Sequence, residues 1–250
     1  MKNTLIIIIC LFYFSSQAQL AKNTDTASAV GPSKEGRFKW RSSIIPAAAL
    51  AYGFATLGAT PLRNLDEAGR HEFFLEHPHE RIRIDDYMQF APGAVTLGLS
   101  ISGVKGRNKT IDQAGIYLVS NIILNSFTQG VKNATDITRP DGTSNAFPSG
   151  HAAEAFASAE FMRREYGDRS VWYTITSYTV ASSVGLFRMY NNKHWFSDVV
   201  AGAGVGILST QAAYWLYPKI KGIFSKNGKG PVVMPYYSNG GISATLSHTF

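Results

Sequence analysis

The sequence predicts an all-α fold, a bundle of about six core helices followed by a short tail that resembles a β-hairpin. Apolar residues recur with helical spacing in six stretches, and no strand pattern of comparable strength lies between them. The 250 residues are 45% hydrophobic and only 16% charged, which excludes a disordered chain and allows a substantial core. A single cysteine excludes a disulfide framework, and the net charge of +7 favours anionic partners.

The N-terminal residues are typical of an exported protein. Residues 1–18 contain a short apolar run, Leu5–Phe14, followed by small and polar residues, as in a signal peptide. An uncleaved membrane anchor is the alternative, although the run is short for one. Cys10 lies inside this run, so the mature chain would contain no cysteine. Residues 19–37 have no periodicity and are expected to form a flexible leader.

The predicted domain covers residues 38–220. Its helical stretches are Ile44–Thr60, Met88–Val104, Ile111–Val131, His151–Tyr166, Val171–Phe187 and Ser197–Tyr217. Residues 221–250 form the tail, in which Val232–Tyr237 and Ile242–Phe250 are predicted to be extended and joined by a Gly-rich turn.

The connector Pro61–Asp86 is long and charged. Its histidines and glutamates (His71, His77, His79, Glu72 and Glu76) match no standard metal-ligand spacing. We therefore interpret this connector as a solvated segment and expect no bound metal.

Two signals conflict on membrane topology. If all six stretches span a membrane, one side collects most of the lysines and arginines of the short connectors, which makes that side cytoplasmic. A signal peptide places the same side outside. Either the signal-peptide interpretation is wrong, or one stretch does not span, or the protein is an exported helical bundle in or on the cell envelope. We favour the last, with the protein facing the periplasm.

Three polar clusters stand out against the apolar background: Lys132–Pro140, Phe147–His151 and Arg188–Asp198. Each lies at the end of a helical stretch. Antiparallel packing of neighbouring stretches brings the ends of the third and fifth, and the starts of the fourth and sixth, to the same end of the bundle. We therefore expect the three clusters to meet at this end of the bundle, which we call the mouth.

The residue types at this mouth suit a tetrahedral oxyanion such as phosphate. Lys132, Arg139 and Arg188 supply three cations. Ser149 is placed to cap the following helix, whose free N–H groups and dipole would face the anion, and Gly150 allows close approach to the backbone.

Two histidines add nucleophilic and acid–base chemistry. Asp198 follows His194 by four residues, so a helix beginning there places both side chains on one face. A carboxylate on one imidazole nitrogen makes the other the better nucleophile. We expect His194 to attack phosphorus, Asp198 to orient it, and His151 to protonate the leaving oxygen; water then cleaves the phosphohistidine.

The motifs K-x6-R-P, P-S-G-H and R-x5-H-x3-D, in this order on a helical scaffold, resemble the type 2 phosphatidic acid phosphatase (PAP2) and vanadium haloperoxidase superfamily. The resemblance covers roughly residues 38–217. It implies catalytic roles for His194, His151 and Asp198, and phosphate-binding roles for the residues that match the family's remaining motif positions: Lys132, Arg139, Ser149, Gly150 and Arg188. The family usually has Ser before the third-motif arginine, and here that position is Phe187.

The expected function is a metal-independent phosphatase, without cofactor, acting on a phosphomonoester or pyrophosphate of an envelope lipid such as phosphatidate, an isoprenyl pyrophosphate or lipid A. A periplasmic acid phosphatase on small soluble phosphoesters is the main alternative. A vanadate-dependent haloperoxidase and a non-catalytic anion-binding protein rank lower. Membrane association is expected. Nucleic-acid binding is not, because the basic residues are spread among connectors, and the sequence indicates no protein partner.

Overall fold

The computed structural model describes residues 40–58, 60–76, 79–225, 232–238 and 241–247, so the predicted signal peptide and leader lie outside the described residues. Each predicted stretch corresponds to one helix, and the all-α fold is confirmed. The helices are α2 (Ile44–Gly58), α5 (Ala91–Ile101), α6 (Thr110–Thr135), α7 (Gly150–Tyr166), α8 (Val171–Tyr190) and α9 (Phe196–Ser225). The last helix continues past the predicted domain boundary at residue 220.

The charged connector is more ordered than predicted. A short 3₁₀ helix, η1 (Trp40–Ser43), precedes α2, and the connector itself forms α3 (Thr60–Arg70), a π-helical turn η2 (His71–Leu75) and α4 (Asp85–Met88). Asp66 of α3 accepts hydrogen bonds from the backbone nitrogen and the hydroxyl of Ser197, both at 2.8 Å. This carboxylate binds the first turn of α9, where helix N–H groups have no intrahelical partner. The connector is therefore packed against the bundle and is not simply solvated.

The connector histidines contact different groups. His71 Nδ1 lies 2.9 Å from Glu76 Oε1 at the surface. His79 stacks on Tyr190 with ring centroids 3.5 Å apart, and its Nε2 lies 2.8 Å from the Tyr190 carbonyl oxygen. His77 lies outside the described residues.

The tail forms the predicted hairpin. Strand β1 (Val232–Ser238) pairs antiparallel with β2 (Gly241–Ser247), in a register that joins Val232 to Ser247 and Ser238 to Gly241.

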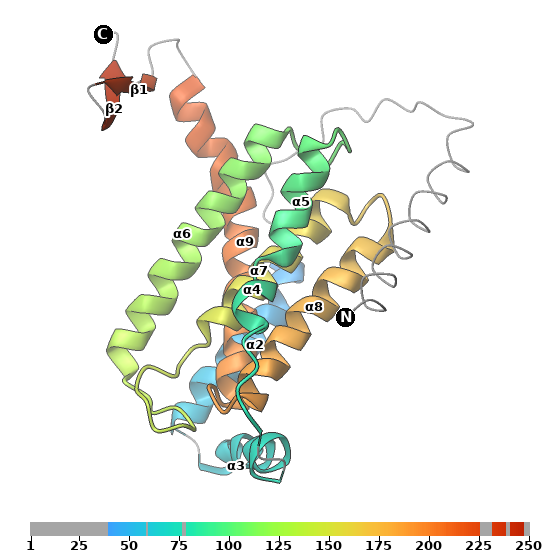
Figure 1. The fold of residues 1–250 in the computed structure, drawn as a ribbon, viewed down its shortest axis with the longest axis vertical. Coiled ribbons are helices and arrows are strands. Elements are labelled where there is room, and N and C mark those ends of the chain that lie inside the picture. The colour runs from blue at the N-terminus through green and yellow to red at the C-terminus, as the bar shows by residue number, and fades with distance from the viewer. Residues whose placement is uncertain (1–39, 59, 77–78, 226–231, 239–240, 248–250) are drawn as a thin grey trace. The chain divides into compact units, whose positions relative to one another are not determined.

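Helix α7 forms the centre of the bundle and packs against α5, α6, α8 and α9 (Figure 1). Its alanines at 152, 153, 155, 157 and 159 are all fully buried. Small side chains here let the neighbouring helices approach closely. Helix α2 covers α9 on another side. A central helix surrounded by neighbours cannot be amphipathic, so its polar residues need partners inside the protein.

The helices alternate in direction as predicted. On α9, Gly202 lies against Ser149 and Gly206 against Ala153, so α7 and α9 run parallel. Ser120 of α6 bonds Thr210 of α9 at 2.8 Å. Further along α9, Tyr217 packs against Gly115, so α6 runs antiparallel to α9. The N-termini of α7 and α9 therefore lie side by side, next to the C-terminus of α6.

Helices α7 and α9 touch backbone to backbone through glycines. A Cβ on Gly206 would lie 2.1 Å from the Ala153 carbonyl oxygen, and one on Gly202 would lie 2.5 Å from the Ser149 carbonyl oxygen. Such distances are far inside van der Waals contact, so any side chain would push the helices apart. At the mouth, the Ser149 backbone nitrogen donates to the Asp198 carbonyl oxygen at 3.0 Å. The glycines thus fix the separation of the two helix N-termini.

The peripheral helices carry large apolar residues on their outer faces. On α6, Gln113, Ser120 and Thr128 are buried, whereas Leu118 and Ile122 are exposed. Helix α8 repeats the pattern, with Ser177 buried and Trp172, Ile175 and Leu186 exposed.

Within the described residues, one helix, Phe196–Ile223, is long and apolar enough to cross a membrane by length and composition. A second candidate is the bent pair Trp40–Gly58 and Leu62–Leu75, which turns by 93°.

Replacing Gly206 by Ala should destabilise the bundle, because the new methyl group meets backbone that cannot rotate away. We expect a loss of about 1–3 kcal/mol in the free energy of unfolding, measured by thermal or denaturant unfolding in detergent. Gly222→Ala is the matched control on the same helix, because a Cβ there meets nothing within 4 Å. Equal stability of Gly206→Ala and the wild type would contradict the close approach.

Candidate active site

The first cluster forms a loop whose carbonyl oxygens hold two of the cations. Asp136, with φ of 40°, ends α6 in the left-handed conformation and turns the chain back towards Lys132. Lys132 Nζ donates to the carbonyl oxygens of Asn145 at 2.6 Å and Ala146 at 3.3 Å. Arg139 Nη2 donates more weakly to the same Asn145 oxygen at 3.4 Å. Both predicted phosphate ligands are therefore gathered around one peptide segment.

The shape of this loop comes from a turn at Asp141. Its carboxylate accepts from the Thr143 nitrogen at 3.1 Å and hydroxyl at 2.7 Å, and Gly142 has a φ of 85°. Lys193 Nζ lies 2.6 Å from Asp141 Oδ2. Partial burial raises the pKa of Asp141, but Lys193 and Thr143 outweigh it and lower the pKa to about 2. Asp141 thus belongs to a turn and also links the loop after the first cluster to the third cluster.

Trp195 makes a second link between these clusters. Its indole Nε1 donates to the Thr138 carbonyl oxygen at 2.9 Å. The Arg70 guanidinium of α3 lies 5.9 Å from the Trp195 ring centroid, which is cation–π distance. Trp195 is therefore a packing and linking residue.

The N-terminus of α7 leaves two backbone amides open to an anion. Ser149 is the N-cap, as predicted, and accepts a long hydrogen bond of 3.4 Å from the Ala152 nitrogen. The Ala153 nitrogen donates to the Ser149 carbonyl oxygen, and the Ser149 nitrogen donates to Asp198. Among the hydrogen bonds of the described residues, none engages the amides of Gly150 and His151. These amides occupy the position where helix N-termini bind phosphate.

His194 and Asp198 form a buried imidazole–carboxylate pair. Nδ1 of His194 lies 3.3 Å from Asp198 Oδ2, and the Trp195 backbone nitrogen holds the same oxygen at 3.0 Å. The ring is only 3% exposed. Burial, followed by the charges of Arg188, Lys132 and Arg139, holds the pKa of His194 well below its usual value. A neutral ring held through Nδ1 presents Nε2 as a nucleophile.

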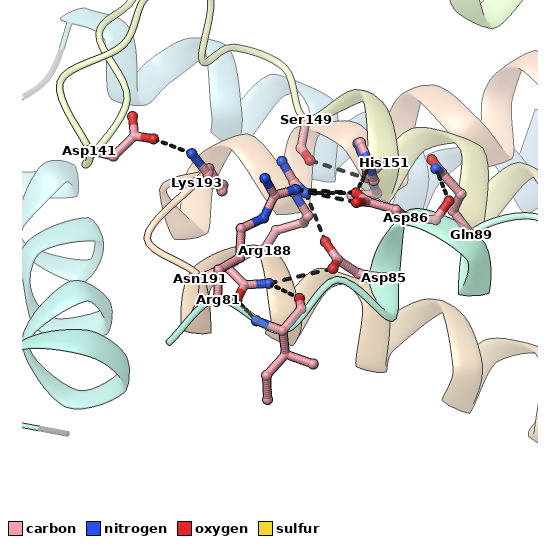
Figure 2. Close-up of polar contacts among 12 residues, drawn as sticks. Arg81, Asp85, Asp86, Gln89, Asp141, Ser149, His151, Arg188, Asn191 and Lys193 are labelled. Atoms are coloured by element: carbon pink, nitrogen blue, oxygen red, sulfur yellow. Dashed lines mark hydrogen bonds and ion pairs between the residues drawn. The ribbon is translucent and has the colours of Figure 1, made fainter. Parts of the chain in front are cut away.

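Arg188 is held by a carboxylate that the sequence analysis did not identify. Its Nη1 lies 2.7 Å from Asp85 Oδ2, and both side chains are buried (Figure 2). Asn191 accepts from the Ile82 nitrogen at 2.9 Å and donates to the Ile82 carbonyl oxygen at 2.8 Å, which fastens the connector before α4 to the end of α8. Phe187, where the resembled family usually has Ser, is half-buried.

His151 also has a carboxylate partner. Its Nε2 lies 3.0 Å from Asp86 Oδ1, and the same oxygen lies 3.7 Å from Arg188 Nη1 (Figure 2). Arg81 Nη2 approaches Asp86 at 3.4 Å from the exposed side. Ligand atoms of Asp85, Asp86 and His151 lie within 4.8 Å of one another, close enough to hold a cation. Because the Arg188 guanidinium already occupies Asp85, we interpret the cluster as an ion-pair network.

The structure thus brings the three predicted clusters to one end of the bundle. Every predicted site residue lies at a helix end or in the loops between them. Asp85 and Asp86 were missed, although a signal existed: the same alternation of helices places the start of α5, and hence the connector before it, at the mouth. Because Asp85 and Asp86 belong to no motif and no periodic pattern, the sequence analysis assigns them to a solvated connector.

Comparison with known proteins agrees with the motifs. The family model described as the PAP2 superfamily matches residues 120–221. The chain is 41% identical over 158 residues to a lipid A 1-phosphatase of Porphyromonas gingivalis, which covers 61% of this chain and 35% of that protein. It is 33% identical over 76 residues to the bacitracin transport permease protein BcrC of Bacillus licheniformis, covering 30% of this chain and 36% of that protein. The chain therefore spans about a third of the length of these curated relatives.

Two solved structures are similar at lower identity. The LpxE of Aquifex aeolicus is 20% identical with a TM-score of 0.46, over 59% of this chain and 92% of that one. The first transmembrane PAP2 type phosphatidylglycerolphosphate phosphatase from Bacillus subtilis is 18% identical with a TM-score of 0.46, over 71% of this chain and 96% of that one.

The matched segment runs from the middle of α6 through most of α9 and includes all three clusters. Residues 120–221, which carry every residue predicted to bind phosphate or act on it, are therefore a PAP2-superfamily segment.

Proposed function

We propose that the protein is a phosphatase that hydrolyses a phosphomonoester or pyrophosphate of an envelope lipid through a phosphohistidine intermediate. One arrangement carries this proposal: three cations and two open helix amides surround a buried imidazole–carboxylate pair. The cations are Lys132, Arg139 and Arg188. Such a group can hold the three equatorial oxygens of a transferring phosphoryl group while an in-line nucleophile attacks.

In the first step, His194 Nε2 forms a bond to phosphorus as the bond to the leaving oxygen breaks. Asp198, on Nδ1, stabilises the positive charge that develops on the ring. His151 gives a proton to the leaving oxygen, which departs as an alcohol or a phosphate. In the second step, neutral His151 takes a proton from a water that attacks phosphorus, the P–N bond breaks, and inorganic phosphate is released.

The apolar outer faces of the peripheral helices favour a lipid substrate. Large apolar side chains lie on the outer faces of α6 and α8, and such an exterior suits a bundle surrounded by lipid. The relative named lipid A 1-phosphatase adds support for a lipid phosphate. We therefore place the bundle in the envelope membrane, its mouth facing the periplasm. A soluble acid phosphatase would not need this exterior.

The vanadate-dependent haloperoxidase and the non-catalytic anion-binding protein remain the alternatives of other classes. The first would oxidise halide only with vanadate and peroxide, and the second would bind phosphate without turnover. The neutral nucleophile on Asp198 and the acid–base group at His151 favour hydrolysis over both.

Replacing His194 by Ala should abolish turnover, because it is the one buried imidazole beside the cations in the part of the chain that the structure describes. We expect phosphate release from phosphatidate, an isoprenyl pyrophosphate or a lipid A phosphate in detergent to fall by about 10⁴-fold or more. His71→Ala is the matched control, since His71 is an exposed histidine paired with Glu76. Near-wild-type activity of His194→Ala would contradict the nucleophile.

Turnover should not depend on a divalent ion, because the charge that stabilises the transition state comes from side chains and amides. We expect EDTA to leave phosphate release unchanged and vanadate to inhibit it, since vanadate mimics five-coordinate phosphorus. Loss of activity in EDTA with recovery on adding a divalent ion would overturn the mechanism.

The pH profile should report the lowered pKa of His194. A free imidazole becomes protonated below about pH 6.5 and can then no longer attack. Because the folded protein lowers this pKa, His194 stays neutral and kcat/KM is retained as pH falls through 6.5. The measurement is kcat/KM from pH 5 to 8, with the ionisation of the substrate titrated separately. The prediction would be contradicted if kcat/KM fell on acidification with an apparent pKa of about 6.5 or higher that belongs to the enzyme and not to the substrate.

A further inference from the structure

The candidate active site holds two imidazole–carboxylate pairs, which use opposite nitrogens of the imidazole ring. His194 is held through Nδ1 by Asp198, whereas His151 is held through Nε2 by Asp86. The first pair is buried. In the second pair, the side chains of His151 and Asp86 are 30% and 33% exposed. Only the first pair follows from the sequence motifs, because Asp86 lies 65 residues before its partner.

Asp86 is fixed in place from several sides. Arg81 approaches it at 3.4 Å and Arg188 at 3.7 Å. Its backbone carbonyl oxygen accepts from Gln89 Nε2 at 2.8 Å, and its backbone nitrogen donates to the Arg83 carbonyl oxygen at 3.2 Å. The neighbouring Asp85 anchors α4 to Arg188, and Figure 2 shows both carboxylates turned towards the site. The carboxylate is therefore held in one position relative to the imidazole.

We propose that Asp86 is the positioning residue of the general acid, holding the His151 ring through Nε2 so that the proton for the leaving group is delivered from Nδ1. This inference rests on the proposed function. The carboxylate fixes the tautomer and the ring plane, as a carboxylate does for a catalytic histidine in other hydrolases. It also offsets the charge of Arg188, which opposes protonation of a neighbouring imidazole.

With the His151–Asp86 pair, the proton transfers of both reaction steps balance. In the first step the proton on His151 Nδ1 passes to the leaving oxygen as the P–O bond breaks and His194 Nε2 bonds to phosphorus. His151 is then neutral and keeps its proton on Nε2, where it is hydrogen-bonded to Asp86. In the second step Nδ1 recovers a proton from the attacking water. Asp86 stays ionised throughout and never contacts the substrate.

The test uses the dependence of rate on the leaving group. A good leaving group departs without a proton, whereas an alkoxide needs one. We would compare 4-nitrophenyl phosphate with octyl phosphate, in the same detergent, for the wild type and Asp86→Asn. We expect kcat/KM on octyl phosphate to fall roughly 100-fold and kcat/KM on 4-nitrophenyl phosphate to change by less than about 3-fold. The quantity kcat/KM covers only the steps up to departure of the leaving group, and 4-nitrophenolate departs without a proton from the acid.

Four further variants test the same assignment. Asp86→Glu keeps the charge and should recover part of the octyl phosphate activity. His151→Ala should show the same selective loss in kcat/KM, and adding Asp86→Asn to it should cost little more, because Asp86 acts only through His151. Glu80→Gln removes an exposed carboxylate of the same connector and should match the wild type on both substrates.

The outcomes separate this inference from the function it rests on. If the wild type releases phosphate from neither substrate, the proposed function fails. If the wild type is active and Asp86→Asn loses kcat/KM equally on both substrates, Asp86 supports the fold and the inference is wrong. If Asp86→Asn instead turns over octyl phosphate faster and binds vanadate more tightly, Asp86 competes with the substrate, which also overturns it. Should Asp86→Asn not fold, the comparison of Asp86→Glu with His151→Ala decides.

Discussion

The close approach of α7 and α9 determines the geometry of the rest of the site. Gly202 and Gly206 let the two backbones touch, and the hydrogen bond from Ser149 to the Asp198 carbonyl oxygen closes the contact at the mouth. Two parallel helices in contact place two positive dipole ends beside each other, an arrangement that is unfavourable without an anion. The anion-binding groups and the nucleophile are therefore set by one packing constraint located along the helices, away from the chemistry.

The two histidines use similar partners in different surroundings. His194 lies in a buried environment with three cations nearby, which keeps it neutral and suits a nucleophile. His151 lies nearer the solvent. Burial and the charge of Arg188 lower its pKa, but the Asp86 carboxylate at hydrogen-bond distance opposes this lowering, which suits a group that gives and then takes a proton. Differences in burial and charge thus separate two identical side chains into two roles, the second of which is our proposal.

Much of the bundle and most of the site could be predicted from sequence, because both depend on local patterns. Helical periodicity locates α2 and α5–α9. Motif spacing brings together His194, in the turn before α9, and Asp198, in the first turn of α9. Asp85 and Asp86 could not be found in this way, since their partners Arg188 and His151 are distant in sequence and no periodic pattern marks α4. The sequence also could not show which residues of α6 and α8 are exposed, because this depends on which side of each helix packs against the core.

The cations of the mouth are paired unequally, and this affects how the product leaves. Arg188 has a full counter-charge in Asp85, whereas Lys132 and Arg139 rest on the neutral carbonyl oxygen of Asn145. Among the described residues, these two cations therefore have only carbonyl oxygens as hydrogen-bond partners and can bind inorganic phosphate as well as the phosphoryl group of the substrate. We expect the departure of phosphate, rather than the breaking of either bond to phosphorus, to set the pace of the catalytic cycle.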